Sequence, residues 1–361
     1  MGLQNAGPSS SITGPRSAQH YASRKSGSSS RKSVNSQMLT IVMYHYVRDL
    51  SCTPYPDIKG LLPDNFKGQL EYLCRHYSMC SLNDVRRAMA GESELSENAC
   101  LLTFDDGLAD HYRVVFPILK EHGVPAAFFP SSRPVDEAKV LDVHKIHFVL
   151  ASTKSHEHLV KELLARLRDY RKCSKILPDG ELWNRYGAST RFDGAETVFV
   201  KRMLQDVLPQ DVRSAIVNEL FAKYVTKDEP GFSGELYMNL GEIKEMYAAG
   251  MEIGGHGHNH IWLGKASRQE QANEIKQTYL FLERVMAAPP SGWTLCYPYG
   301  SYNQDTIALA SDFGCAFGLT TKVELASLTR PMEMGRLDTN DLPLVESAVI
   351  SKWTKQVHAN R

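Results

Sequence analysis

Short apolar segments alternate with longer amphipathic segments along most of this chain. Leu39 to Val47 and Ala99 to Phe104 have the length and composition of strands, and Asp64 to His76 has apolar residues at helical spacing. Asp110 to His122 predicts a second helix, and Val124 to Pro130 is apolar throughout, as are strands covered on both faces. This alternation favours parallel β-α-β units, and therefore a barrel or a doubly wound sheet.

The alternation returns in the second half of the chain, where the pattern predicts three further helices and three further strands. The helices span residues 239–249, 267–286 and 302–313, and the strands span 251–254, 293–298 and 315–320. Both halves together predict one α/β fold.

Between residues 133 and 235 the alternation breaks, and three apolar stripes with helical spacing follow one another. The stripes consist of Leu159, Leu163, Leu164 and Leu167, then Val200, Met203, Leu204, Val207 and Leu208, and then Val212, Ile216, Leu220 and Tyr224. We therefore expect an all-helical insertion of two or three helices. It can be a packing elaboration or a lid that shapes a substrate pocket, and the pattern is compatible with both.

These patterns divide the chain into five expected segments. A basic tail covers residues 1–37, two parts of one α/β domain cover 38–132 and 236–345, the insertion covers 133–235, and a polar C-terminal tail covers 346–361. The first tail contains no Asp or Glu, five Lys or Arg residues and eleven Ser residues. Because its apolar residues are too few to bury a core, we expect it to be disordered.

The charge of the chain argues against a nucleic-acid partner. The whole chain has 41 Lys and Arg residues against 41 Asp and Glu residues, and removal of the five basic residues of the tail leaves the rest mildly acidic. A body of this charge lacks the basic surface that binding to a phosphate backbone requires.

No segment predicts export or a membrane span. The sequence shows no apolar stretch behind a basic start, as a signal peptide would, and no run of about 18 apolar residues. The seven cysteines are odd in number, widely spaced and without a Cys-x-x-Cys pair, which favours reduced thiols over disulfides or a cysteine zinc site. These features predict a cytoplasmic protein.

Two adjacent carboxylates, Asp105 and Asp106, stand at the end of the strand predicted over 99–104 and are followed by Gly107. Side chains alternate along a strand, so the two carboxylates should point in different directions. One of them can bind a metal while the other faces substrate or water. The alternative is an Asp-Asp-Gly turn that caps the next helix.

Three histidines, at positions 256, 258 and 260, follow the strand predicted over 251–254. On a turn of helix, His256 and His260 would lie on one face and could share a metal, whereas His258 would point elsewhere. The alternative is a solvated His-rich loop.

A third segment, Tyr297 to Gly300, ends the strand predicted over 293–298 with an aromatic turn. All three segments stand at the carboxyl ends of predicted strands, where α/β barrels and sheets place their sites. One carboxylate and two imidazoles would form a three-ligand site with an open position, which is the pattern of a catalytic metal centre.

These segments resemble the motifs of the polysaccharide deacetylases, also called carbohydrate esterase family 4 or NodB-homology proteins. Thr103 to Gly107 reads Thr-Phe-Asp-Asp-Gly, as the first family motif does. His256 to His260 matches the second motif, His-[Ser/Thr]-x-x-His, except that Gly257 replaces the Ser or Thr. Tyr297 to Gly300 resembles a Tyr-Pro-Tyr-Gly variant of the third motif, and Met43 to Val47 resembles the Tyr-His strand that opens many of these domains.

The resemblance covers about residues 38–130 and 237–342 and implies an irregular (β/α) barrel of about seven strands, here with an all-helical insertion. It implies a metal-dependent hydrolase that removes an N-acetyl group from an amino sugar of a polysaccharide, an oligosaccharide or an activated-sugar precursor. The implied partner is a carbohydrate. The implied cofactor is a divalent metal, zinc first, with cobalt, nickel or ferrous iron as alternatives.

The resemblance also implies roles for individual residues. Asp105 matches the catalytic base of the family, and Asp106, His256 and His260 match its metal ligands. Tyr299 matches the position whose backbone N–H helps to bind the oxyanion.

Two departures from the family pattern concern the catalytic groups. Many members carry an Arg that braces the base at the position of Cys296, so the group that orients Asp105 is open. The late Leu-x-His that supplies the general acid has no match, and the candidates for that role are His45, His258, Arg336 and Asp338. These departures keep two alternatives open: an impaired glycan-binding module, and a deformylase or cyclic amidase on the same scaffold.

Overall fold

A ring of short parallel strands forms the centre of the computed structural model, which describes residues 38–51, 53–172, 174–190 and 193–359. The expected disordered tail, residues 1–37, lies outside the described residues. Four strands pair in parallel in the order β5-β4-β3-β1, namely β1 (Met38–Tyr44), β3 (Ala99–Asp106), β4 (Ala126–Pro130) and β5 (Glu252–Ile253). Strand β9 (Leu337–Asp338) pairs in parallel with the other side of β1.

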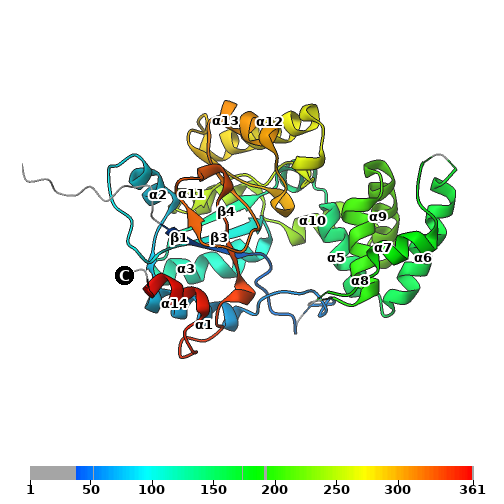
Figure 1. The fold of residues 1–361 in the computed structure, drawn as a ribbon, viewed down its shortest axis with the longest axis horizontal. Coiled ribbons are helices and arrows are strands. Elements are labelled where there is room, and N and C mark those ends of the chain that lie inside the picture. Colours follow the sequence, from blue (N-terminus) through cyan, green and yellow to red (C-terminus); the bar gives the residue numbers. More distant parts are fainter. Residues whose placement is uncertain (1–37, 52, 173, 191–192, 360–361) are drawn as a thin grey trace, which may run out of the picture. The chain divides into compact units, whose positions relative to one another are not determined.

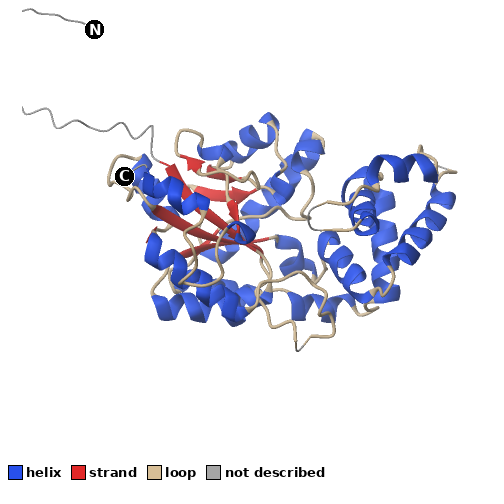
Figure 2. Cartoon of the chain, turned by 60° about the horizontal axis from the view of Figure 1, so that its bottom comes forward, coloured by secondary structure: helices blue, strands red, loops and turns tan. Residues whose placement is uncertain are grey.

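The ring closes through β6 (Trp293–Cys296) and β7 (Cys315–Leu319), which pair with each other. Isolated parallel pairings join Gly255 to Leu295 on one side and Leu319 to Met334 on the other. The described strands β1, β3, β4, β5, β6, β7 and β9 thus form an irregular α/β barrel, which confirms the predicted fold class (Figures 1 and 2). Two further strands, β2 (Ser78–Met79) and β8 (Ala326–Ser327), extend its margin.

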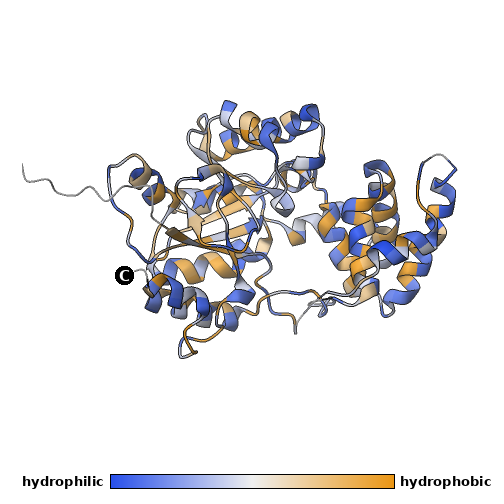
Figure 3. Cartoon of the chain, viewed as in Figure 1, coloured by the Kyte–Doolittle hydropathy of each residue, from blue (hydrophilic) through white to orange (hydrophobic). Residues whose placement is uncertain are grey.

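Alternation along β3 separates the two sides of the barrel wall. Leu102 and Phe104 pack with the covering helices, whereas Leu101 packs with residues of β6 and β7 in a separate apolar cluster. Asp105 lies two residues beyond Thr103 on the same side as Leu101, so its carboxylate enters the barrel. The apolar strands and the two-faced helices are visible in Figure 3.

Helices between the strands cover the outside of the barrel. They are α1 (Pro63–His76), α3 (Phe116–His122), α11 (Leu240–Ala248), α12 (Arg268–Met286) and α13 (Gln304–Asp312), together with α2 (Leu82–Met89), which the sequence analysis did not predict. The helix expected over 110–122 begins as a π-helical turn, His111–Val115, before α3 continues it.

Between β4 and β5, the described residues form helices and no strand. The insertion contains more helices than the two or three that we expected. They are α4 (Ser132–Glu137), α5 (Asp142–Ser152), α6 (His156–Tyr170), α7 (Asp179–Tyr186), α8 (Ala195–Arg202), the π-helical turn Met203–Val207, α9 (Gln210–Tyr224) and α10 (Glu229–Leu236). The predicted stripes on α6, α8 and α9 supply much of an apolar core that belongs to this region. Figure 1 shows α5 to α9 gathered beside one another, away from the outer helices of the barrel.

The segment that we expected to be a polar C-terminal tail contains a docked helix, α14 (Lys352–Ala359). Thr354 and Val357 are buried, and Thr354 Oγ1 lies 2.8 Å from the hydroxyls of both Tyr72 and Tyr77. The apolar spacing did not predict this helix, because only four of its eight residues, Trp353, Thr354, Val357 and His358, are buried or partly buried.

Among the described residues, no helix combines the length and the apolar composition that a membrane crossing needs. The five cysteines that the structure describes, Cys74, Cys80, Cys100, Cys296 and Cys315, are free thiols.

The contact between Thr354 and the two tyrosines predicts the stability of the C-terminal docking. Thr354→Val keeps the shape of the side chain but removes the hydroxyl that both buried tyrosines share. We expect the free energy of unfolding, measured with urea, to fall by about 1–3 kcal/mol. Thr354→Ser keeps the hydroxyl and should cost less, so an equal loss in both variants would contradict the hydrogen-bond explanation.

Candidate active site

The adjacent carboxylates Asp105 and Asp106 end β3 and are both buried, with 1% and 5% of their surface exposed. As expected from strand alternation, they face different partners. Asp106 has a φ of 77°, and Gly107 continues the turn with a φ of 71°. A Cβ at Gly107 would lie 2.6 Å from Cβ of Pro130, so the close approach of β4 requires glycine here.

Arg336 supplies the cation that faces Asp105. Its Nη1 donates to Asp105 Oδ1 at 2.8 Å and its Nη2 donates to Oδ2 at 2.7 Å, and the guanidinium is fully buried. Nε donates to the carbonyl oxygen of Thr320, and Nη1 also reaches the hydroxyl of Thr103. The carboxylate therefore has a fixed orientation, because a two-point contact leaves it little freedom to rotate.

The electrostatic effect of this pair is large. Burial alone would raise the pKa of Asp105, but the Arg336 guanidinium outweighs burial and holds that pKa well below its usual range. Burial likewise opposes the charge of Arg336, yet Asp105 raises its pKa above the usual value. The ion pair therefore favours the charged form of Arg336, which makes it a poor candidate for the general acid.

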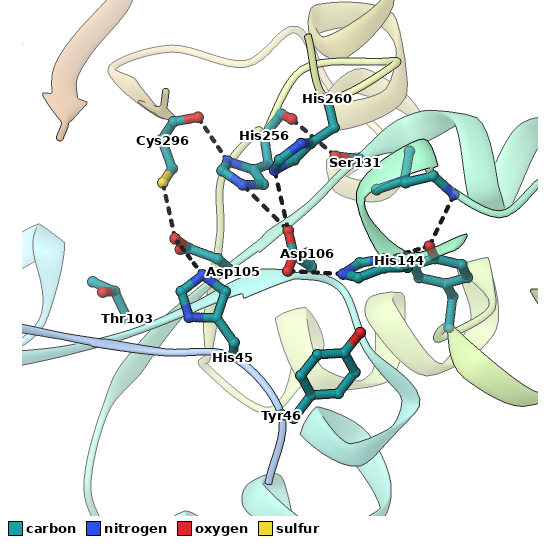
Figure 4. A network of polar contacts seen from close by, with 12 residues as sticks. His45, Tyr46, Thr103, Asp105, Asp106, Ser131, His144, His256, His260 and Cys296 are labelled. Carbon is teal, nitrogen blue, oxygen red and sulfur yellow. Dashed lines mark hydrogen bonds and ion pairs between the residues drawn. The ribbon is translucent and has the colours of Figure 1, made fainter. Parts of the chain in front are cut away.

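Asp106, His256 and His260 come together on the other side of the turn (Figure 4). Asp106 Oδ1 lies 3.3 Å from Nε2 of His256 and 3.5 Å from Nε2 of His260, and all three residues are buried. One ligand atom from each residue lies within 4.8 Å of the others. The residues that the sequence proposed as a metal triad are thus brought together.

The donors and acceptors of this triad fit a bound cation. His256 Nδ1 lies 2.8 Å from the carbonyl oxygen of Cys296, which can only accept, so Nδ1 carries the proton. Burial opposes the charge of His256, but without a metal Cys296 and Asp106 raise the pKa of His256 well above its usual value. In the neutral ring that a metal requires, the lone pair of Nε2 faces Asp106 Oδ1 at 3.3 Å, and no other group among the described residues donates to this buried oxygen. A cation between these acceptors removes their repulsion, and imidazole with carboxylate is a donor set that suits zinc.

The third member of the triad is held neutral. Burial is the largest cause that lowers the pKa of His260 to about 3, so its ring presents a free lone pair near neutral pH. Neutral imidazole is the form that binds metals.

The histidines lie on a loop and not on the helical turn that we expected. Gly257 has a φ of 73° and His260 a φ of 57°, so the chain reverses and brings the two imidazoles together without helical spacing. Glu274 of α12 holds this loop, because its carboxylate accepts the N–H groups of His258 and Asn259, both at 2.8 Å. The sequence analysis missed Glu274, which no spacing rule connects to the loop.

Tyr299 lies beside the triad in the turn Pro298–Gly300 and has a φ of 57°. Its ring packs edge-on against His260 with centroids 4.6 Å apart, and it stacks on Trp262 at 4.4 Å. These contacts place the ring of Tyr299 next to His260.

The candidates for the general acid differ in where they point. His45 Nε2 lies 3.9 Å from Asp105 Oδ2, and 39% of the His45 side chain is exposed. His258 instead faces Ser132 at 2.8 Å and Glu137 at 3.3 Å. Asp338 accepts the backbone N–H of Asn340, and it caps the short helix Thr339–Asp341. Of the four residues that we named, the structure brings only His45 to the open side of Asp105.

One further residue of the site came from a part of the chain where no motif stands. His144, on α5 of the insertion, is fully buried, and its Nε2 lies 3.1 Å from Asp106 Oδ2. A histidine within the apolar run of α5 was the available signal, but the sequence contains no indication of its partner.

The comparisons with known proteins agree with this geometry. A family model described as polysaccharide deacetylase matches residues 92–169 and 227–318, and the unmatched interval lies in the helical insertion. YxkH of Bacillus subtilis (strain 168), whose name assigns it to the polysaccharide deacetylases, is 26% identical over 295 residues, which are 81% of this chain and 68% of that protein. The poly-beta-1,6-N-acetyl-D-glucosamine N-deacetylase of Escherichia coli (strain K12) is 42% identical over 60 residues, which are 17% of this chain and 9% of that protein.

Two solved structures share the fold. The deacetylase PplD of Streptococcus pyogenes, in complex with acetate, has a TM-score of 0.52 at 19% identity and covers 83% of this chain and 92% of its own. IcaB from Ammonifex degensii has a TM-score of 0.50 at 18% identity and covers 90% of this chain and 96% of its own.

The ion pair predicts how stability responds to Arg336→Met in metal-free protein. The variant leaves Asp105 buried without its cation, which should lower the free energy of unfolding at pH 7 by about 3–5 kcal/mol. In the wild type the pKa of Asp105 is lower in the folded than in the unfolded state, so the stabilisation is complete above about pH 4 and is lost as the pH falls further. In Arg336→Met, burial raises the pKa of Asp105. The cost of burying the charged carboxylate without its cation therefore appears as the pH rises through this raised pKa.

The difference in the free energy of unfolding between the wild type and Arg336→Met, measured with urea, should therefore be larger at pH 7 than at pH 4.5. A matched control is Arg336→Met in an Asp105→Asn background. Because position 105 then carries no charge that needs a cation, the loss in the free energy of unfolding should be smaller. A difference that is equal at both pH values would contradict the assigned charge state of Asp105.

Proposed function

We propose that this chain, which belongs to the polysaccharide deacetylase family, is a metal-dependent hydrolase that removes N-acetyl groups from an amino-sugar glycan. The observation that carries the proposal is the pairing of two unlike carboxylates at the end of β3. Asp105 is oriented by Arg336, and Asp106 faces two histidines that complete a metal donor set. A base and a metal site side by side are what hydrolysis of an amide by water requires.

Asp106, His256 and His260 would hold the metal, which when bound would polarise the acetyl carbonyl and make water more acidic. Asp105 takes the proton of the attacking water, for which it is ready because Arg336 keeps it ionised. The N–H of Tyr299 donates to the oxygen of the acetyl carbonyl as negative charge develops there. The C–N bond then breaks, and acetate and a free amine leave.

His45 completes the transfer of protons in this proposal. A carboxylate with a lowered pKa holds a proton only weakly, so Asp105 must pass it on. His45 Nε2 lies 3.9 Å from Asp105 Oδ2 and is partly open to solvent, which suits a group that receives the proton and delivers it to the leaving amine.

The substrate class is supported by the relatives. One of them is named for poly-beta-1,6-N-acetyl-D-glucosamine, and the family model is that of polysaccharide deacetylases. We propose a glycan with N-acetylglucosamine units as the substrate. The free thiols of the described cysteines support the cytoplasm as its location, in which case the glycan is an intermediate that is still being assembled.

The alternative of an impaired binding module loses one of its two supports. It was based on the missing Arg at position 296 and on the missing late Leu-x-His, and Arg336, which directly precedes β9, contacts Asp105 in place of that Arg. Acetate release from polymeric N-acetylglucosamine, chitooligosaccharides and nucleotide-linked N-acetyl sugars, each with and without zinc, separates the substrate classes. Glycan binding without release from any of them would overturn the proposed function.

Two variants separate the base from the metal site. Asp105→Asn should lower turnover about 100- to 10,000-fold while zinc still binds, because it removes the proton acceptor and leaves the ligands in place. His256→Ala should lose both zinc and turnover. Acetate release and zinc content, measured on the same preparations with thermal melts as a check of folding, test both. Near wild-type turnover in Asp105→Asn would show that the base is wrongly assigned.

The acid is tested by His45→Gln, which removes the titrating group but keeps a polar side chain. We expect kcat to fall about 100-fold or more, with KM and zinc content unchanged. His258→Gln is the matched control, because its ring faces Ser132 and Glu137, and it should retain most of the activity. Equal effects of the two substitutions would refute the role of His45.

A further inference from the structure

We propose that His144, which the helical insertion contributes, is a positioning residue that leaves one oxygen of Asp106 free for the metal. This inference rests on the proposed function, because it assumes that Asp106 is a metal ligand. It assigns the insertion a part in the metal centre, beyond the two roles of packing and lid that the sequence allows.

The contacts of His144 determine which of its nitrogens carries the proton. The backbone N–H of Leu141 donates to the hydroxyl of Tyr237 at 3.1 Å, and that hydroxyl lies 2.5 Å from Nδ1 of His144. Asp106 Oδ2 is a carboxylate oxygen that can only accept, so Nε2 carries the ring proton and donates it at 3.1 Å. In the neutral ring, Nδ1 then accepts the proton of the Tyr237 hydroxyl, which itself accepts from Leu141. In Figure 4, His144 lies on the side of Asp106 that is opposite to Asp105.

The two oxygens of Asp106 are thus used differently. Oδ2 is occupied by His144, while Oδ1 is buried, lacks a hydrogen-bond partner and faces His256 and His260. This division should make Asp106 a ligand through one oxygen with a fixed direction. Groups that orient metal ligands in this way commonly change metal affinity 10- to 100-fold when they are removed.

The backbone at the end of the insertion holds the same turn. Tyr237 pairs with Leu108, and the N–H of Met238 donates to the carbonyl oxygen of Gly107 at 3.0 Å. The first motif is therefore held by the His144 side chain, near the start of the insertion, and by Tyr237 and Met238, just beyond its end. Asp106 has a positive φ that non-glycine residues rarely adopt, so a support of this kind is needed.

The helix that carries His144 is itself fixed from within the insertion. Lys145, the next residue, is buried, and its Nζ lies 2.8 Å from Glu229 and 2.6 Å from Asn218. These contacts tie α5 to α10 and α9. A residue that held Asp106 from a mobile helix could not define the direction of a ligand, whereas one on a pinned helix can.

The experiment compares metal affinity among His144→Ala, His144→Gln and Tyr237→Phe, by competition for zinc with a chromophoric chelator. His144→Ala should bind zinc 10- to 100-fold more weakly. His144→Gln should recover much of this loss, since its amide nitrogen can still donate to Asp106, and Tyr237→Phe should show a smaller loss. The visible absorption of bound cobalt should change in His144→Ala, because the geometry of the ligand changes.

The matched control is His156→Gln on α6, which replaces the same residue type in the insertion, where its ring contacts Leu150 and Thr197. Its zinc affinity and cobalt spectrum should equal those of the wild type. Wild-type affinity and spectrum in His144→Ala would overturn the inference alone. Should His144→Ala fail to fold, unchanged affinity in Tyr237→Phe would overturn it. Absence of zinc and cobalt binding in the wild type would overturn the proposed function and this inference together.

Discussion

Two buried carboxylates on consecutive residues require separate sources of positive charge or hydrogen-bond donation, and this requirement organises the site. Each partner comes from a different part of the chain. Asp105 receives the guanidinium of Arg336 from beyond the last barrel helix, and Asp106 receives the N–H of His144 from the insertion. The remaining oxygen of Asp106 faces the histidines of the second barrel half. The barrel must close and the insertion must dock before the end of β3 can bear its charge.

The same arrangement gives the two carboxylates different chemistry. Arg336 balances the charge of Asp105 and keeps that carboxylate ionised, which suits its proposed role as the acceptor of a proton. Asp106 keeps one oxygen without a hydrogen-bond partner, directed at two imidazoles. With the Asp105–Arg336 pair neutral, a divalent metal at Asp106 would leave a net positive charge, which favours the anionic oxygen that develops during hydrolysis of an amide.

The position of Arg336 explains the departure at Cys296. The family resemblance led us to expect an arginine at that position of the third motif, and its absence suggested an impaired site. The thiol of Cys296 instead lies 3.1 Å from Nη2 of Arg336, so the small side chain leaves room for a guanidinium that arrives from the residue directly before β9. A cation thus stands beside Asp105, although a different place in the sequence supplies it. The orientation of the carboxylate depends on where the cation lies in space and not on which segment carries it.

The sequence by itself determined the class of fold, the place of the helical insertion and the residues that could bear the chemistry. The spacing of apolar residues indicates which faces of strands and helices are buried. Motifs at the carboxyl ends of predicted strands indicate which side chains meet at the mouth of the barrel. Only the tertiary structure decided that Arg336 braces Asp105, and that His45 is the general-acid candidate whose ring is directed at Asp105. It also decided that His144 reaches Asp106 and that the last residues form α14. These contacts join residues 38 to 282 positions apart, and local periodicity carries no information about such pairings.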